Sequence, residues 1–322
     1  MRVLVTGGAG FIGSNFVRSL IEGRWAGLAG AEVVVLDALA IGGTLASLAP
    51  VTGSPRLRIE VGDIRDPVLV TGLMTGTDLV VHFAAETHVD RSIADGAPFV
   101  SVNVLGTQVL LEAAARAGIG KFIQVSTDEV YGSIASGSWS ETQPLDPSSP
   151  YSAAKAGADL LALAYHRTYG LPVCVTRSSN NYGPYQFPEK LIPRFVTRLL
   201  DGQKVPLYGD GQQVRDWLHA DDHCDAVARV AASGRPGQVY NVGGGTELTN
   251  AELASRILAA VGADASMVEP APDRPGHDQR YSVDWTKIRD ELGWAPRVEF
   301  GAGLAATIAW YARNRSWWEP LG

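Results

Sequence analysis

The first 180 or so residues alternate between short apolar runs rich in β-branched residues and longer segments whose apolar residues recur at helical spacing. The runs with strand character cover residues 2–6, 32–36, 56–64, 78–87, 121–125 and 171–177. The segments with helical character cover residues 11–20, 67–74, 97–117 and 150–169. Strands that alternate with helices in this way predict a doubly wound parallel sheet with helices on both faces, an α/β fold.

The pattern changes after residue 178, where turn-forming and amide residues replace the regular alternation. An amphipathic helix is expected at 193–201, and residues 221–232 are apolar at helical spacing and are expected to return to the sheet. Later elements are predicted as a strand at 238–245 and helices at 250–261, 286–292 and 303–313. We expect a smaller C-terminal lobe interleaved with the first, with a cleft between them.

A glycine-rich turn joins the first strand to the first helix. Gly7, Gly10 and Gly13 form a G-x-x-G-x-x-G pattern that is flanked by a strand and a helix. Glycines allow the backbone to turn tightly and to approach a pyrophosphate at the helix N-terminus. Asp37 ends the second strand about twenty residues further on, where a carboxylate accepts hydrogen bonds from the adenosine ribose. These features predict a dinucleotide-binding domain.

We assign residues 1–178 to this Rossmann-type domain, with a returning segment near 216–243, and residues 179–322 mainly to a substrate-binding lobe. The cofactor is expected to be NAD, because no Arg or Lys between Asp37 and Pro55 could pair with the 2′-phosphate of NADP. A plain turn role for Asp37 is the alternative. The other residues expected to bind the cofactor, at the start of the first helix and at strand ends, are Phe11, Ile12, Asp63, Ile64, Phe83, Ala84 and Ala85.

The stretch 121–155 contains most of the groups that can perform chemistry. Asp128 and Glu129 follow the fifth strand at the carboxyl edge of the predicted sheet, where ligands bind. Tyr151 and Lys155 lie one turn apart on the next helix. An ammonium group beside a phenol favours phenolate, so Tyr151 is predicted to act as a base near neutral pH. A solvated turn and a solvated helix face are the alternatives.

The composition narrows the classes of partner. The formal net charge of −7 and pI of about 5.4 argue against nucleic acid, and an anionic ligand would need local cations such as Lys190, Arg215 and Arg274. No apolar run approaches the ~18 residues of a membrane span. The two cysteines, Cys174 and Cys224, have neither disulfide nor metal spacing, so we expect reduced thiols, a cytoplasmic location and no metal.

Segments along almost the whole chain resemble the extended short-chain dehydrogenase/reductase family and, within it, the nucleotide-sugar 4,6-dehydratases. The matching segments are T-G-G-A-G-F-I-G, A-A-E-T-H-V-D-R-S-I, S-T-D-E-V-Y-G, S-P-Y-S-A-A-K, S-N-N-Y-G-P-Y-Q-F-P-E-K-L-I-P, G-D-G-Q-Q-V-R-D-W and D-R-P-G-H-D-Q-R-Y. One departure is the A-L-A-I-G-G sequence after Asp37, where the family usually has a Lys and a Tyr-Ala-Gly turn. This difference predicts looser contacts to the adenosine ribose.

The resemblance implies a catalytic Tyr151–Lys155 pair, with Thr127 binding sugar hydroxyls, Asp128 acting as acid and Glu129 as base. It also implies a pocket for a nucleotide-diphosphate hexose, lined by Asn180, Lys190, Leu191, Pro206, Tyr208, Arg215, Asn250 and His277. We add Thr87 and Arg274 to the substrate-binding set and Asn181 to the cofactor-binding set. The resemblance further implies a homodimer in which the helices at 97–117 and 151–169 form a four-helix bundle.

Two adjacent carboxyl groups would be of no use to a simple alcohol dehydrogenase, but they suit an acid–base reaction that follows oxidation. Once C4 of a hexose is a ketone, its C5 proton becomes acidic, and one carboxylate can remove it while a protonated carboxyl assists departure of the C6 hydroxyl. Neighbouring carboxyls repel, so one tends to keep its proton and the other to ionise. NAD would be regenerated in the site and would stay tightly bound.

Two alternatives remain at this point. A nucleotide-sugar 4-epimerase or decarboxylase has the glycine-rich loop and the Tyr–Lys pair, but lacks a Thr-Asp-Glu run before V-Y-G. A non-catalytic NAD sensor belongs to a different class and would have no use for Tyr151, Lys155 and both carboxyls.

Overall fold

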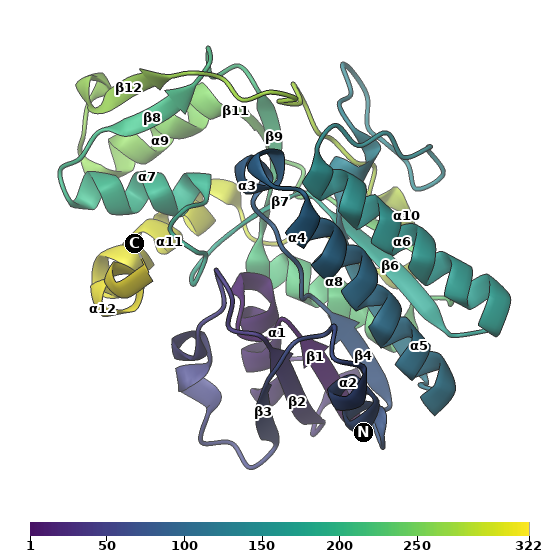
Figure 1. The fold of residues 1–322 in the computed structure, drawn as a ribbon. Helices are drawn as coiled ribbons and strands as arrows, with labels where there is room; N and C mark the ends of the chain where they lie inside the picture. The colour runs from purple at the N-terminus through teal and green to yellow at the C-terminus, as the bar shows by residue number, and fades with distance from the viewer. Residues whose placement is uncertain (322) are drawn as a thin grey trace.

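The computed structural model describes residues 1–321 and is built around a seven-stranded parallel sheet (Figure 1). The strands are β1 (Arg2–Thr6), β2 (Glu32–Asp37), β3 (Leu57–Val61), β4 (Leu79–His82), β5 (Lys121–Thr127), β6 (Val173–Ser178) and β10 (Val239–Val242). Their order across the sheet is β10-β6-β5-β4-β1-β2-β3. From β1 the chain adds β2 and β3 on one side and then β4, β5, β6 and β10 on the other. The point between β1 and β4 is therefore a topological switch point, where a crevice opens at the carboxyl ends of the strands. The predicted doubly wound parallel sheet is confirmed.

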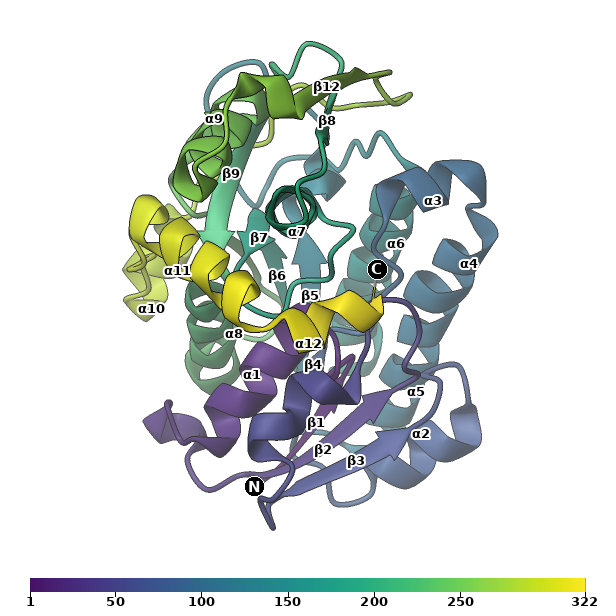
Figure 2. The same ribbon diagram turned by 90° about the vertical axis from the view of Figure 1, so that its left-hand side faces the viewer.

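Helices cover both faces of the sheet (Figure 2), and the apolar residues between helices and sheet form two separate cores. One face is covered by α1 (Phe11–Ile21) and α8 (Ala220–Ser233), and the other by α2 (Pro67–Met74), α5 (Thr107–Ala117) and α6 (Pro150–Tyr169). Strands that are buried on both faces read as continuous apolar runs, which is why β1 and β2 were recognisable from the sequence.

The segment after β9 (Val214–His219) returns to the sheet. Helix α8 packs on α1, and β10 pairs in parallel with β6, with Val239 opposite Val175 and Val242 opposite Ser178. The seventh strand therefore comes from a part of the chain that follows the first elements of the second lobe. The domain boundary at residue 178 stays a prediction.

The helix predicted at 97–117 is continuous but not regular. It begins as α4 (Ala97–Phe99), passes through a π-helical segment (Val100–Gly106) and ends as α5. In the wider turn Asn103 lies against Glu86, accepting from its backbone N–H at 2.8 Å and donating to its carbonyl at 3.0 Å. The predicted long helix at 97–117 is confirmed, and the contacts of Asn103 with Glu86 lie in its π-helical segment.

This same helix, Ala97–Ala117, is long and apolar enough to cross a membrane by length and composition, with a mean hydropathy of 1.2 in its most apolar window. No such segment was expected from the apolar runs in the sequence. In the fold, however, α5 packs against α2 and α6, so its apolar residues belong to the core of the helical layer.

The second lobe has two small sheets, β11-β9-β7 and β12-β8, with helices packed around a third apolar core. Its strands are β7 (Asn180–Tyr182), β8 (Val205–Tyr208), β9 (Val214–His219), β11 (Glu247–Thr249) and β12 (Val268–Ala271). The remaining helices of the chain are α3 (Val89–Ala94), α7 (Leu191–Leu200), α9 (Asn250–Val261), α10 (Thr286–Leu292), α11 (Phe300–Arg313) and α12 (Arg315–Trp318).

Helix α11 starts three residues before its predicted start because Glu299 caps it, accepting from the backbone N–H groups of Gly301 and Ala302 at 2.8 and 2.7 Å.

Candidate active site

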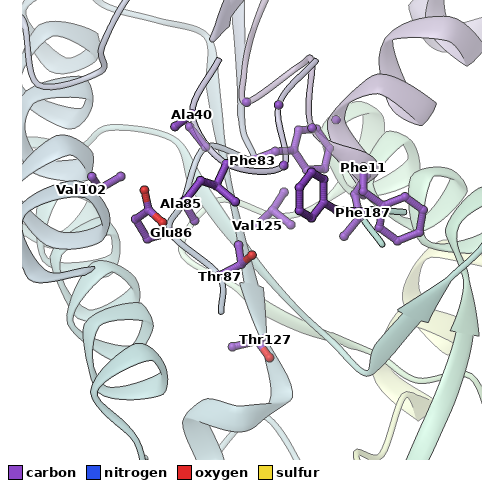
Figure 3. Close-up of a pocket in the computed structure, with 18 of the residues that line it drawn as sticks. Phe11, Ala40, Phe83, Ala85, Glu86, Thr87, Val102, Val125, Thr127 and Phe187 are labelled. Atoms are coloured by element: carbon purple, nitrogen blue, oxygen red, sulfur yellow. The ribbon is translucent and has the colours of Figure 1, made fainter. Parts of the chain in front are cut away.

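A cleft runs along the carboxyl ends of the central strands and is lined by every residue predicted to bind the cofactor. These residues are Gly7, Gly10, Phe11, Ile12, Gly13, Asp37, Asp63, Ile64, Phe83, Ala84, Ala85, Tyr151, Lys155 and Asn181. Figure 3 shows Phe11 and Phe187 on one side of the cavity and Glu86 and Val102 on the other. Thr127, Asp128 and Glu129 line the same cleft, so the cofactor residues and the carboxyl pair face one space.

The glycine-rich loop has room for a pyrophosphate but not for side chains. Gly7 has φ +68°, and a Cβ there would lie 2.5 Å from the backbone nitrogen of Ala84. A Cβ at Gly13 would collide with the carbonyl oxygen of Gly7. Gly10 is the N-cap of α1 and makes no side-chain cap, so the first N–H groups of the helix point toward the cleft without a side-chain acceptor. The loop therefore fits a dinucleotide phosphate.

Asp37 links the glycine-rich loop to the loop that follows β2. One carboxylate oxygen accepts from the backbone of Ala9 and the other from the backbone of Leu39, both at 2.8 Å. Leu39 has φ +51°, an uncommon conformation for a non-glycine residue. Asp37 thus has a structural role in addition to its place on the cleft.

Two further groups of residues line the cleft but were given no ligand role from the sequence. One group directly follows Asp37, and the other follows β7. They are Ala38, Ala40, Ile41, Gly42, Gly43, Gln186, Phe187 and Glu189. The sequence could have indicated both groups. The first group is the segment that departs from the family pattern, and the second lies inside the matching S-N-N-Y-G-P-Y-Q-F-P-E-K segment.

Tyr151 and Lys155 face the cleft from the first turns of α6, whose N-terminus is fixed by a Ser149–Ser152 capping box. The Lys155 ammonium donates to the carbonyl of Val125 at 2.7 Å. Burial lowers the pKa of Lys155 to about 8, against the opposing effect of Asp159. Burial raises the pKa of Tyr151, and the charges of Glu129 and Asp128 raise it further. The protein's own groups thus keep the phenol protonated, contrary to the expectation from its spacing to Lys155.

The two adjacent carboxyl groups differ in their surroundings. Burial raises the pKa of Asp128 well above its usual range, and the neighbouring Glu129 raises it further. Burial also raises the pKa of Glu129, but the cations Arg274, Arg215 and Lys190 oppose this. Asp128 is therefore the group that keeps a proton, while Glu129 ionises more readily.

Thr127 is placed to orient this pair. Its hydroxyl donates to Asp128 at 3.3 Å and accepts from the backbone of Glu129 at 3.2 Å, as the N-cap of the 3₁₀ turn Asp128–Tyr131. Within residues 1–321, the acidic groups here form no cluster with His or Cys that could hold a metal ion.

The residues predicted to bind substrate fall into two groups. Thr87, Asn180 and Lys190 line the cleft, and Lys190 donates to the Thr87 carbonyl at 2.8 Å. The others lie in the second lobe, outside the cleft lining; they are Leu191, Pro206, Tyr208, Arg215, Asn250, Arg274 and His277.

Three of these second-lobe residues have partners within the chain. Arg215 is buried and donates to the carbonyls of Val214 and Asp278, not to the adjacent Asp216. Arg274 lies 3.5 Å from Asp90, and the His277 ring lies 2.6 Å from Asp273. Since both arginines also act on the pKa of Glu129, the second lobe presents positive charge to the reaction site.

Comparisons with known proteins agree with this arrangement. The profile of the family described as GDP-mannose 4,6 dehydratase matches residues 4–307. The chain is 59% identical over 321 residues to dTDP-glucose 4,6-dehydratase from Streptomyces niveus, covering 100% of this chain and 96% of the relative.

Two solved structures are also similar to the chain. A dTDP-glucose 4,6-dehydratase from Streptomyces venezuelae with NAD bound has a TM-score of 0.99 and 60% identity, with 100% of both chains covered. A UDP-glucose 4-epimerase from Thermotoga maritima with UDP-glucose has a TM-score of 0.90 and 32% identity, with 98% of this chain and 100% of that chain covered. The fold alone therefore does not separate dehydration from epimerisation.

Proposed function

The chain belongs to the GDP-mannose 4,6 dehydratase family, among the extended short-chain dehydrogenases/reductases, and from this membership we propose that it dehydrates dTDP-glucose to dTDP-4-keto-6-deoxyglucose. The observation that carries the proposal is the carboxyl pair Asp128–Glu129, which shares one cleft with Tyr151 and has one member biased toward each protonation state. An epimerase needs no such pair.

The cofactor is NAD, consistent with the fit of the glycine-rich loop and with Asp37 on the cleft. When bound, NAD would accept the hydride from C4 and, once reduced, would donate a hydride to C6. Tyr151 removes the C4 hydroxyl proton. Lys155 orients the site through its bond to Val125 and provides positive charge beside the phenol.

The elimination is performed by the turn after β5. Glu129, the more readily ionised carboxyl, takes the C5 proton, and Asp128 donates its proton to the departing C6 hydroxyl. Glu129 then returns a proton to C5. Asp128 is buried, whereas Glu129 is only partly buried and can exchange its proton with solvent before it reprotonates C5.

The second lobe is proposed to hold the nucleotide diphosphate. Lys190 reaches the cleft directly, and Arg215 and Arg274 place positive charge near Glu129. In a protein of net charge −7, such a local group of cations is what a diphosphate requires. Tyr208, at the end of β8, is proposed to contact the pyrimidine.

An isotope experiment tests the reaction. With deuterium at C4 of dTDP-glucose, the dehydratase delivers the label to the new C6 methyl group and incorporates solvent hydrogen at C5. Mass measurement should show loss of water, and NMR should place the label at C6. Deuterium returned to C4 would contradict the proposal and indicate a 4-epimerase. Parallel reactions with UDP- and GDP-glucose test the choice of nucleotide.

Assembly and location are further proposals. Apolar side chains are exposed along the helices of the proposed four-helix bundle, with Val100 55%, Leu105 52% and Leu160 59% exposed, which supports a homodimer through this surface. Light scattering of the Leu105→Glu and Leu160→Glu variants would test it. The free, buried thiols of Cys174 and Cys224 support the cytoplasm as the working compartment.

A further inference from the structure

A chain of buried polar side chains lies beneath the cleft. Asp159 accepts from Nε of Arg177 at 3.0 Å, and Nη1 of Arg177 donates to the hydroxyl of Tyr131 at 2.7 Å. The Tyr131 hydroxyl in turn donates to Oδ1 of Asn241 at 2.9 Å. All four side chains are at most 3% exposed. Charged and polar groups this deep in a protein need defined partners, so the arrangement is specific.

The direction of these hydrogen bonds is fixed by chemistry. The amide nitrogen of Asn241 donates to the carbonyls of Trp139 and Asp284, so its oxygen must face Tyr131. The Tyr131 hydroxyl therefore donates to Asn241 and accepts from Arg177, which has only donors. Burial raises the pKa of Tyr131 to about 12, so the hydroxyl keeps the proton that it donates.

Asp159 and Tyr131, two members of this hydrogen-bonded series, belong to the two elements that carry the catalytic side chains. Asp159 is on α6, one turn after Lys155 and two turns after Tyr151. Tyr131 closes the 3₁₀ turn that contains Asp128 and Glu129. Arg177, on β6, bridges them, and its guanidinium also lies 4.7 Å from the centre of the Tyr131 ring. Helix α6, which carries Tyr151 and Lys155, and the 3₁₀ turn Asp128–Tyr131 are thus both hydrogen-bonded to the buried guanidinium of Arg177.

We propose that Asp159, Arg177 and Tyr131 are positioning residues that hold the acid–base turn in register with the Tyr151–Lys155 helix. This inference rests on the proposed dehydration, because only a reaction with separate oxidation and elimination steps needs both groups aligned on one sugar. Tyr151 and Lys155 are kept in place by α6 and by the bond to Val125. The turn is held at its start by Thr127 and at its end by the bond of Arg177 to the Tyr131 hydroxyl. Loss of that hydroxyl should therefore slow elimination more than oxidation.

The Tyr131→Phe variant tests this, since it keeps the ring over Arg177 and removes only the hydroxyl. A misplacement of about 1 Å can lower a rate on the order of 100-fold. We expect kcat to fall at least ~10-fold with KM within about twofold, bound reduced nicotinamide to accumulate during turnover, and the kinetic isotope effect of C5-deuterated substrate to exceed that of the wild type.

Tyr240→Phe is the matched control. Tyr240 is also fully buried, and its hydroxyl donates to Glu291 on the far side of β10, away from the cleft. Arg177→Lys is a second test: it keeps a positive charge but cannot serve Asp159 and Tyr131 with a rigid fork, so it should change the same readouts in the same direction.

The proposal is overturned if Tyr131→Phe and Arg177→Lys behave like Tyr240→Phe, or if they lower kcat with neither accumulation of reduced nicotinamide nor a larger isotope effect. Failure of the proposed function looks different, because the wild-type protein itself would then release no water from dTDP-glucose.

Discussion

Two elements face the same cleft: helix α6, with Tyr151 and Lys155, and the turn after β5, with Asp128 and Glu129. They differ in which neighbouring charges counter the effect of burial on the pKa values of these groups. On the helix, burial favours the neutral form of both groups, and within residues 1–321 the main compensation is Asp159 acting on Lys155. On the turn, burial also favours neutral carboxyls, but three cations of the second lobe counter it at Glu129, and one of them, Arg215, also does so at Asp128.

The difference shows which half of the chemistry is prepared by the protein and which depends on the cofactor. The acid and the base of the elimination are distinguished by the chain's own residues. The oxidation base is not prepared in this way, because burial and the charges of Glu129 and Asp128 raise the pKa of Tyr151. The oxidation also needs NAD as its hydride acceptor, so the first step depends on the cofactor.

Replacing Tyr151 by Phe should have the largest effect, because the oxidation starts both halves of the reaction. Turnover should fall at least ~100-fold and up to about 10⁴-fold, with no reduced nicotinamide formed. Stopped-flow absorbance during a single turnover measures both quantities. Activity near that of the wild type would place the base elsewhere.

Glu129→Gln should separate the two halves. Oxidation at C4 remains possible with Tyr151 intact, but C5 deprotonation loses its acceptor, so product formation should fall about 10³-fold while reduced nicotinamide accumulates. Absorbance in the reduced-nicotinamide band together with product analysis checks this. Full dehydration by this variant would remove Glu129 from the mechanism.

Asp128→Asn should give a similar but milder loss, about 100-fold, because an amide can still hydrogen-bond to the C6 oxygen but protonates it poorly. Steady-state rates of product formation at saturating substrate, compared with those of Glu129→Gln, measure the difference. A loss larger than that of Glu129→Gln would contradict this ranking of acid and base.

The same variant also tests the pKa of Asp128 through stability. Burial raises that pKa in the folded protein, so the stability it contributes is present at low pH and is lost as pH rises through the folded pKa. Asp128→Asn should therefore raise Tm relative to wild type at about pH 8 and lose that advantage toward about pH 4. Thermal unfolding at both pH values is the measurement. An advantage that grows as pH falls would show that the pKa is not raised.

Cofactor choice should show the smallest effect. Asp37 would face the 2′-phosphate of NADP, and repulsion of unit charges about 4 Å apart amounts to at least ~1 kcal/mol even in water. Calorimetric titration of cofactor-free protein should show weaker binding of NADP than of NAD. Equal affinities would limit Asp37 to its bonds with Ala9 and Leu39.

Much of the cofactor half could be predicted from the sequence because its determinants are local. The glycine-rich turn, Asp37 and the Tyr151–Lys155 spacing each lie within a few residues of a recognisable strand or helix, and all of them reach one cleft. The raised pKa of Tyr151 and the lowered pKa of Lys155 could not be predicted in this way, because both result from burial and burial depends on the whole fold.

The Asp159–Arg177–Tyr131 chain was missed for a related reason. Its members come from α6, β6 and the turn after β5, and none carries a motif that suggests the others. The contact of Asn103, in the π-helical segment at Val100–Gly106, with Glu86 before α3 likewise joins residues that no shared motif connects. Local propensity contains no information about such partners.

The parallel pairing of β10 with β6 has a consequence for biosynthesis. As the chain leaves the ribosome, β6 has an unpaired edge and α1 lacks the cover of α8 until residues 220–242 have emerged. Exposed strand edges promote aggregation, and an N-terminal domain ordinarily completes its folding first. Here the nascent N-terminal half must wait until residues 179–219 of the second lobe, and then α8 and β10, have been translated, so a fragment ending at residue 178 should aggregate instead of forming a separate NAD-binding unit.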